Sequence, residues 1–291
     1  MIIVTGATGH LGHRITERLL ARGVPADRVG VSVRDPRKAQ ALADRGVRVR
    51  RGSFTEAGSL ADAFEGASQV LIVSVDKMGD EAVSQHRAAI DGAVAAGARR
   101  ILYTSHMGAG ASSRFQACRD HIATEEALRV SGVPFTSLRN GFYATSALQF
   151  LGHGLESGDV ALPADGPVSW TAHADLADAA AAVLADEGRF DGPTPPLTAA
   201  QALTFADIAG IAADVTGRTV TRTTAPDDLF REQLTGGGVP AATADQLLGM
   251  FTASRAGEFA AVDPALATLL GREPTTLRTV LREQLSGPVG Q

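Results

Sequence analysis

Three glycines near the amino terminus have the spacing of a diphosphate-binding turn. Gly6, Gly9 and Gly12 follow the apolar run of residues 1–4. They lie where a stretch with apolar side chains at helical spacing, residues 11–20, begins. A glycine turn between a strand and a helix lets the backbone approach a pyrophosphate, and the helix N-terminus adds free N–H groups and a positive dipole end. We therefore expect this turn to bind a dinucleotide. The alternative is an ordinary tight turn in which the glycines are incidental.

The residues after the next expected strand bear on the choice between NADP and NAD. Arg34 and Asp35 follow the valine-rich run of residues 28–33, and Arg37 and Lys38 come close behind. At this place in a dinucleotide-binding unit, a carboxylate accepts the ribose 2′-hydroxyl of NAD, whereas a guanidinium matches the 2′-phosphate of NADP. Because Arg34 comes first among three basic residues, NADP is the favoured cofactor. Because Asp35 is adjacent, NAD remains a possible cofactor. A further alternative is that Arg34 is only a solvated loop residue that binds no ligand.

The tyrosines of the chain exclude one familiar mechanism. Standard short-chain dehydrogenases pair a tyrosine with a lysine four residues later, so that the lysine lowers the pKa of the tyrosine that donates the proton. Here Tyr103 and Tyr143 are followed at that spacing by Met107 and Ala147. A carbonyl reduction that depends on this pair is therefore disfavoured, and so is a sugar-nucleotide epimerase.

Composition places the chain among ordinary globular proteins. It has 291 residues, of which 44% are hydrophobic, and a net charge of −5, so no basic footprint for nucleic acid is visible. Its one cysteine, Cys118, excludes a disulfide within the chain and fits a reducing cytoplasm. With no targeting segment before the first strand and no apolar run long enough to span a bilayer, we expect a cytoplasmic protein without membrane contact. A homodimer is left open.

Strand and helix patterns alternate through the first half of the chain. Such alternation predicts an α/β fold with a Rossmann-type, doubly wound parallel sheet. The second half is less regular and predicts a smaller, mainly helical substrate lobe. We expect a dinucleotide-binding domain over residues 1–155, with the helix of residues 172–188 packed back on it, and a substrate-binding lobe over residues 156–291. The expected strands cover residues 1–4, 28–33, 47–50, 70–75, 99–105 and 135–140.

Several motifs together resemble one family. They are the glycine turn and the segments of residues 33–39, 84–87, 103–105, 120–125, 138–143 and 274–277. This set is similar to the NmrA-like atypical short-chain dehydrogenases/reductases, and most similar to the bacterial NAD(P)H:quinone oxidoreductase type 2 group. The resemblance runs nearly end to end. Members include reductases of quinones and of plant phenolics, and also redox-sensing regulators that bind NADP without turning it over.

The resemblance also implies a set of site residues. Cofactor contacts are expected from Gly6, Thr8, Gly9, His10, Leu11, Gly12, Arg34, Ser74, Val75, Thr104, Asn140, Gly141, Phe142, Tyr143 and His173. His121 stands where other members carry a lysine, and His173 stands where the quinone reductases carry an arginine. His121 and Tyr143 are the expected catalytic residues. Phe142, Phe150 and Trp170 are the expected aromatic slot for a flat substrate, with Trp170 in a loop over the cleft. Scattered core aromatics are the alternative.

The histidines allow several interpretations. His121 and Glu125 lie four residues apart, on one face of the expected helix. His121 could hydrogen-bond the ribose or a substrate oxygen and act as a proton donor near neutral pH, or it could simply pair with Glu125. His86 begins an apolar helix face and is expected to be a packed, hydrogen-bonded histidine. Cys118 with His121, His86 and His173 lacks the compact second pair of ligands that a metal needs, so no metal is expected.

Three functional hypotheses follow. The first is an oxidoreductase that passes hydride from the nicotinamide to a quinone or a similar planar aromatic acceptor, which needs positioning more than proton transfer. The second is a tailoring enzyme, a reductase or a cofactor-assisted monooxygenase, acting on an aromatic polyketide quinone. The third is a sensor that binds NADP, catalyses nothing and docks to a partner. Oxidation of NADPH by a panel of quinones separates the enzyme from the sensor.

Overall fold

The computed structural model describes residues 1–152 and 154–286, and the chain divides into two compact units. We call the first the sheet unit, made of residues 1–111, 117–140 and 173–197. We call the second the helical unit, made of residues 112–116 and 141–172 and of the described residues from 198 onward. Residue 153 and residues 287–291, which fall within the two expected domains, lie outside the described residues. Among the described helices, none is both long and apolar enough to cross a membrane.

The sheet unit is built around a parallel sheet. Its described strands, in spatial order, are β10 (Gly192–Pro193), β6 (Phe135–Asn140), β5 (Arg100–His106), β4 (Gln69–Ile72), β1 (Ile2–Thr5), β2 (Val29–Val33) and β3 (Arg48–Arg51). Every pairing between these neighbours is parallel. The strand order reverses direction at β1, between β4 and β2, which is where an open α/β sheet places its ligand crevice. The prediction of a Rossmann-type fold is confirmed.

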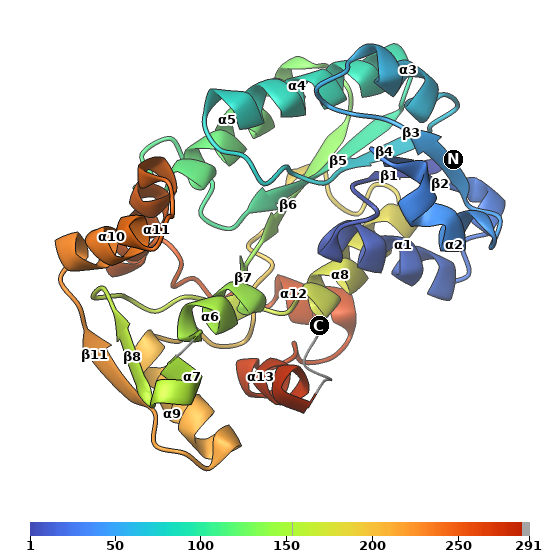
Figure 1. Ribbon diagram of the computed structural model, residues 1–291. Helices are drawn as coiled ribbons and strands as arrows, with labels where there is room; N and C mark the ends of the chain where they lie inside the picture. The colour runs from blue at the N-terminus through green and yellow to red at the C-terminus, as the bar shows by residue number, and fades with distance from the viewer. Residues whose placement is uncertain (153, 287–291) are drawn as a thin grey trace. The chain divides into compact units, whose positions relative to one another are not determined.

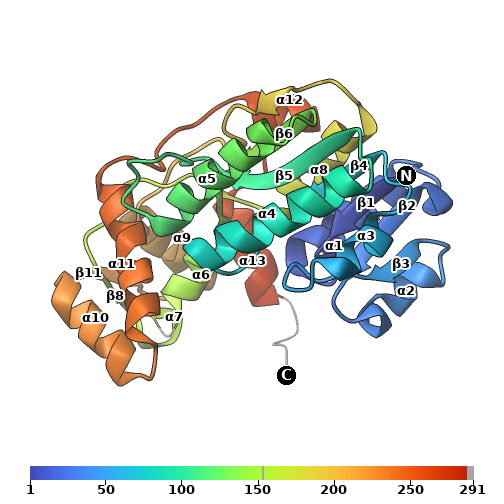
Figure 2. The ribbon, with the colours of Figure 1, turned by 90° about the horizontal axis from the view of Figure 1, so that it is seen from above.

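Helices cover both faces of this sheet (Figure 1). One face carries α3 (Gly58–Phe64), α4 (Asp80–Ala95) and α5 (Gln116–Val130), which lie in front of the sheet in Figure 2. The other face carries α1 (His10–Ala21) and α8 (His173–Ala185), which lie side by side and are joined by an ion pair between Arg18 and Asp178. The short segments η1 (Ala26–Arg28), η2 (Pro36–Ala39) and α2 (Gln40–Ala43) complete the unit.

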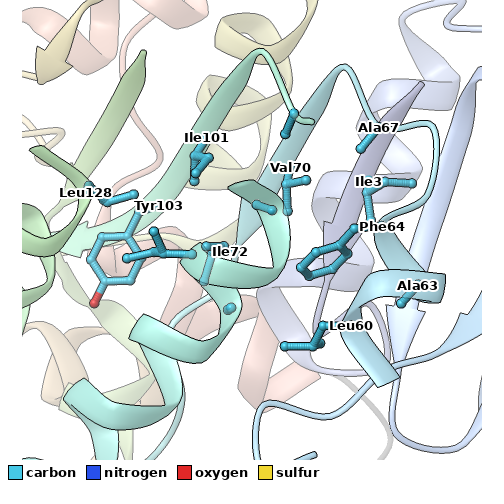
Figure 3. Close-up of a cluster of buried hydrophobic side chains, with 14 residues drawn as sticks. Ile3, Leu60, Ala63, Phe64, Ala67, Val70, Ile72, Ile101, Tyr103 and Leu128 are labelled. Carbon is cyan, nitrogen blue, oxygen red and sulfur yellow. The ribbon is translucent and has the colours of Figure 1, made fainter. Parts of the chain in front are cut away.

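The apolar core of the sheet unit explains why its inner strands β1, β2 and β4 are buried on both faces. Strands of a parallel sheet with helices on both sides are buried on both faces, and all five residues of β2 are buried. On the α3–α5 side, Ile3, Val70 and Ile101 from three neighbouring strands pack with Phe64 of α3 and Leu128 of α5 (Figure 3). This packing holds the carboxyl ends of β1, β4 and β5 at one edge of the sheet.

The strand expected over residues 70–75 ends at Ile72, and side chains explain the difference. The N–H groups of Val73, Ser74 and Val75 donate not to a neighbouring strand but to Thr5 Oγ1 at 2.9 Å, Thr104 Oγ1 at 2.8 Å and His86 Nε2 at 3.0 Å, respectively. The backbone therefore leaves the ladder and becomes a loop tied at three successive positions.

The helical unit combines two small strand pairs with helices. Its strands pair as β7 (Phe142–Tyr143) with β9 (Trp170–Thr171) and as β8 (Asp159–Leu162) with β11 (Thr221–Thr224). Its helices are α6 (Ala144–Leu151), α7 (Gly154–Ser157), α9 (Phe205–Thr216), α10 (Asp227–Gly236), α11 (Ala241–Arg255), α12 (Ala265–Leu270) and α13 (Leu277–Ser286). A capping box of Thr204 and Asp207 begins α9, and left-handed Gly217 ends it.

Candidate functional site

The glycine turn has the geometry that the sequence predicts for a diphosphate-binding turn. Gly6 has a φ of +62°, which favours glycine, and it directs the chain from β1 toward α1. A Cβ on Gly12 would lie 2.7 Å from the carbonyl carbon of Gly6 and would collide with the oxygen of the same group. Gly9 caps α1 without a side-chain hydrogen bond. Within the described residues, the first N–H groups of α1 therefore have no intrahelical acceptor and no capping side chain, as an anion site requires.

The other predicted residues of the turn differ in how much of each is exposed to solvent. Thr8 and His10 are exposed, whereas Leu11 is buried in the core and can offer a ligand only its backbone. An open pocket of about 640 Å³ begins at Thr8, Gly9 and His10 and continues along α1. His173, the first residue of α8, lies beside this turn, with its ring centroid 6.5 Å from that of His10. Burial, together with His10 and Arg14, lowers the pKa of His173 to about 4, so the imidazole is neutral at pH 7.

Arg34 and Asp35 lie in different environments at the end of β2. The Arg34 side chain is exposed, and it makes no hydrogen bond or ion pair within the described part of the chain. Asp35 is already occupied: its carboxylate accepts the backbone N–H of Arg37 at 3.1 Å and two guanidinium bonds from the same residue at 2.9 Å. This hydrogen bonding lowers the pKa of Asp35. Of the two residues, Arg34 is therefore the one whose side chain is available to a ligand.

The tied loop after β4 carries the predicted cofactor residues Ser74 and Val75. Thr104, another predicted contact, is buried, and its hydroxyl accepts the Ser74 N–H and lies 3.1 Å from Ser74 Oγ. Thr104 thus acts on this edge of the sheet by holding Ser74 in place. The loop is held again farther along, where Asp120 Oδ2 of α5 accepts the Gly79 N–H at 2.7 Å.

Asn140 ends β6 at the same edge of the sheet. Its side chain is 3% exposed, and within the described residues its Oδ1 has no hydrogen-bond partner. A buried amide oxygen without a donor is costly, by about 1–3 kcal/mol, so such an atom is a sign of a ligand that supplies the donor. Gly141, the next residue, is buried, and Phe142 and Tyr143 of β7 are partly buried.

His121 pairs with Tyr103, so the predicted pairing with Glu125 is wrong. Its Nδ1 lies 2.7 Å from the hydroxyl of Tyr103, and its ring stacks on that of His106 at 6.0 Å. Glu125 instead accepts Ser105 Oγ at 2.7 Å and forms a bidentate ion pair with Arg139. Burial, then His106 and His86, hold the pKa of His121 well below its usual value. A neutral imidazole still has one N–H to donate, so the role of His121 as a hydrogen-bond or proton donor stays a prediction.

His86 is the packed, hydrogen-bonded histidine that the sequence predicts. It is 2% exposed and bonded to Val75 and Thr124. Burial lowers its pKa from 6.5 to about 4.

The low pKa of His86 predicts acid sensitivity of the fold. Between pH 6.5 and about 4 the unfolded chain binds a proton at His86 and the folded chain does not, so stability is complete above pH 6.5 and is lost as the pH falls toward 4. The difference between the two pKa values of His86 corresponds to about 3 kcal/mol of unfolding free energy. Urea unfolding of wild type and His86→Gln at about pH 7.5 and about pH 4.5 measures it. The variant should lose less stability on acidification, and equal losses would contradict the assignment.

The predicted aromatic slot belongs to a cluster inside the helical unit. Trp170 is 2% exposed, lies in β9 and donates its indole N–H to Leu203 O at 3.1 Å. It is therefore a packing residue of a strand, and the expected loop position is wrong. Its ring contacts Phe142 edge-on at 5.2 Å, and Phe150 contacts Phe205 and Phe251. Phe142 and Phe150 are partly buried and remain predictions as substrate contacts.

No group of three or more metal-ligating side chains is found in the described part of the chain.

Comparison with known proteins gives the family. The model of the NmrA-like family matches residues 1–281. The chain belongs to this family.

One curated relative and two solved structures match this NmrA-like protein over nearly the whole length of both chains. Quinone oxidoreductase 2 of Escherichia coli is 35% identical over 278 residues, which are 95% of this chain and 96% of the relative. The crystal structure of the NADPH-dependent quinone oxidoreductase of Escherichia coli with NADPH has a TM-score of 0.91 at 34% identity and covers 98% of this chain and 100% of its own. Citrobacter triphenylmethane reductase with NADP(H) has a TM-score of 0.88 at 34% identity and covers 97% and 99%.

The contribution of Tyr103 to this NmrA-like protein was missed from the sequence. In the sequence it served only to show the missing lysine partner and as part of the family segment of residues 103–105, yet it joins His86 and His121. The available signal was its position on a strand of seven residues between two helices that each carry a histidine on the side facing the sheet. Asp120, which holds the loop at Gly79, gave no signal, because its partner lies 41 residues away in the sequence.

Proposed function

We propose that this protein is an NAD(P)H-dependent oxidoreductase that reduces a quinone or a similar planar aromatic acceptor. The observation that supports it best is the end-to-end likeness to a quinone oxidoreductase crystallised with NADPH. The chain's own residues fit such a cofactor in two places. In the turn, Gly6 has a positive φ and a Cβ on Gly12 would collide with the backbone of Gly6. The buried Oδ1 of Asn140 has no hydrogen-bond donor among the described residues, so a ligand can supply one. A nicotinamide cofactor, when bound, supplies a hydride, the equivalent of two electrons and one proton.

The residues of the sheet unit have the following roles in this proposal. Backbone N–H groups at the start of α1 bind the pyrophosphate, and Arg34 binds the 2′-phosphate. NADPH is favoured over NADH because the Asp35 carboxylate, which would accept a ribose hydroxyl, is already bonded to Arg37. Ser74 and Val75, held by Thr104 and His86, form a rigid backbone along the cofactor path.

We further propose that the acceptor is a quinone. A quinone gains aromaticity on reduction, so it needs orientation and one hydrogen-bond donor more than an acid with a tuned pKa, which suits a chain without a Tyr–Lys pair. We assign His121 as that donor, and the hydroxyl of Tyr143 as a second candidate donor. In the helical unit, Phe142 and Phe150 offer aromatic rings to a flat acceptor, with Trp170 packed behind Phe142.

Oxidation of NADPH by a panel of acceptors tests the proposal. We expect steady turnover with a simple naphthoquinone, slower turnover with NADH, and competition between the quinone and a triphenylmethane dye. The Gly12→Ala variant is the control for turnover that does not pass through the site. Tight NADPH binding without reduction of any acceptor would instead identify a sensor, and absence of binding to any pyridine nucleotide would overturn the proposal at its first step.

A further inference from the structure

Tyr103 connects two histidines on the α4–α5 side of the sheet unit. It is fully buried on β5, between His86 of α4 and His121 of α5, with ring centroids 5.2 Å and 5.6 Å away. Figure 3 shows its ring in the apolar cluster with the hydroxyl at the edge. That oxygen lies 2.7 Å from His121 Nδ1 and 3.4 Å from His86 Nδ1. The three side chains form one hydrogen-bonded chain.

The positions of the protons in this chain follow from its fixed end at His86. The backbone N–H of Val75 can only donate, so His86 Nε2, 3.0 Å away, carries no proton. At the other nitrogen, Thr124 gives its hydroxyl proton to the Asp120 carbonyl at 2.9 Å and must therefore accept from His86 Nδ1 at 3.0 Å. Two independent contacts agree on a neutral His86 with its proton on Nδ1.

This result bears on the tautomer of His121. Because His86 Nδ1 already bears a proton, it cannot accept from Tyr103, so of the two imidazole nitrogens near the Tyr103 hydroxyl only His121 Nδ1, 2.7 Å away, can accept its proton. With that hydrogen bond, the proton of a neutral His121 lies on Nε2. His121 lines a pocket of about 130 Å³ together with Val75, Asp120 and Lys77.

We propose that Tyr103 is a positioning residue that holds neutral His121 as its Nε2–H tautomer, so that Nε2–H donates a hydrogen bond to the acceptor oxygen that becomes negatively charged during reduction. The chemistry rests on the proposed function, whereas the tautomer rests on the hydrogen bonds alone. One carbonyl oxygen of the quinone gains the hydride, the electron pair passes through the ring as it becomes aromatic, and the other carbonyl oxygen becomes a phenolate bonded to Nε2–H. A proton from a solvent water, which leaves hydroxide, completes the hydroquinone. His121 keeps its own proton throughout.

The surroundings of His121 favour a neutral donor. His106, stacked on it at 6.0 Å with an interplanar angle of 21°, accepts the Gly108 N–H at Nδ1, and the Cys118 thiol lies 3.3 Å from the same atom. His106 is thus neutral as well, since burial also lowers its pKa to about 4. A neutral imidazole can stabilise a developing oxyanion through a hydrogen bond without transferring a proton.

Nitrogen NMR of the full-length protein labelled with ¹⁵N-histidine tests the tautomer directly, and His121→Gln assigns the resonances. In wild type we expect His121 Nδ1 to have the shift of an unprotonated nitrogen and Nε2 that of a protonated one. In Tyr103→Phe, which keeps the ring but removes the hydroxyl, the two shifts should move toward each other. Thr136→Val, which loses a buried hydrogen bond to Arg100 at the other end of the sheet, should leave them unchanged.

Kinetics test the second half of the inference. Tyr103→Phe should lower kcat for a naphthoquinone about tenfold and leave the Kd for NADPH within about twofold. A protonated His121 Nδ1 in wild type, or Tyr103→Phe shifts identical to wild type, would overturn the role of Tyr103 whatever the activity. If the nitrogen shifts are as expected but the protein reduces no acceptor, the donor role of His121 and the proposed function would be overturned. The tautomer of His121 would still stand.

Discussion

Replacing Gly12 by alanine should abolish tight binding of the dinucleotide. A Cβ at this position would lie 2.7 Å from the carbonyl carbon of Gly6 and 3.0 Å from the oxygen of Thr5, so the turn itself would have to move. We expect the Kd for NADPH to rise at least about 100-fold, ~2.8 kcal/mol at 1.4 kcal/mol per tenfold. The fold should lose about 1–3 kcal/mol to overpacking. Titration calorimetry and urea unfolding measure the two effects.

The matched control is Gly210→Ala. Gly210 is also a glycine inside a helix, α9, but a Cβ there meets nothing within 4 Å. This variant should bind NADPH as wild type does and should gain up to about 1 kcal/mol, because alanine is the better helix former. If Gly12→Ala bound NADPH within about threefold of wild type, the turn would not be the pyrophosphate site.

Replacing Arg34 by alanine should weaken NADPH and spare NADH. Arg34 is exposed at the end of β2 and has no protein partner among the described residues, so its removal disturbs no packing. Loss of a charged hydrogen bond to the 2′-phosphate should cost about 1.5–3 kcal/mol, a rise in the NADPH Kd of about 10- to 150-fold. The Kd for NADH should change less than about threefold, since NADH lacks that phosphate.

Arg99→Ala is the control for charge alone. Arg99 is likewise an exposed arginine of the sheet unit, but it precedes β5 and so lies at the amino ends of the strands, with a loose ion pair of 3.8 Å to Glu187. The Arg99→Ala variant removes the same charge as Arg34→Ala, and it should change the Kd for NADPH and the Kd for NADH by no more than about twofold. Equal weakening of NADPH and NADH in Arg34→Ala would show that Arg34 does not read the 2′-phosphate.

The family and the fold class were predicted from the sequence and are confirmed. Both depend on local patterns. Gly6 and Gly12 mark a turn because a positive φ and a missing Cβ are properties of the residues themselves. The missing Tyr–Lys pair is likewise a matter of which residues are present. A chain that alternates apolar strands with helices has few alternatives to a doubly wound sheet.

The partners of each polar side chain were decided only by the tertiary structure. Helical spacing placed His121 and Glu125 on one face but could not say what lies across from it, and there His121 meets Tyr103 while Glu125 meets Arg139. Trp170 was expected in a loop, yet a two-residue strand buries it. Hydrogen bonds between residues tens of positions apart depend on how helices pack on the sheet. Periodicity determines which face of a helix packs, and the packed neighbours determine proton positions and pKa values.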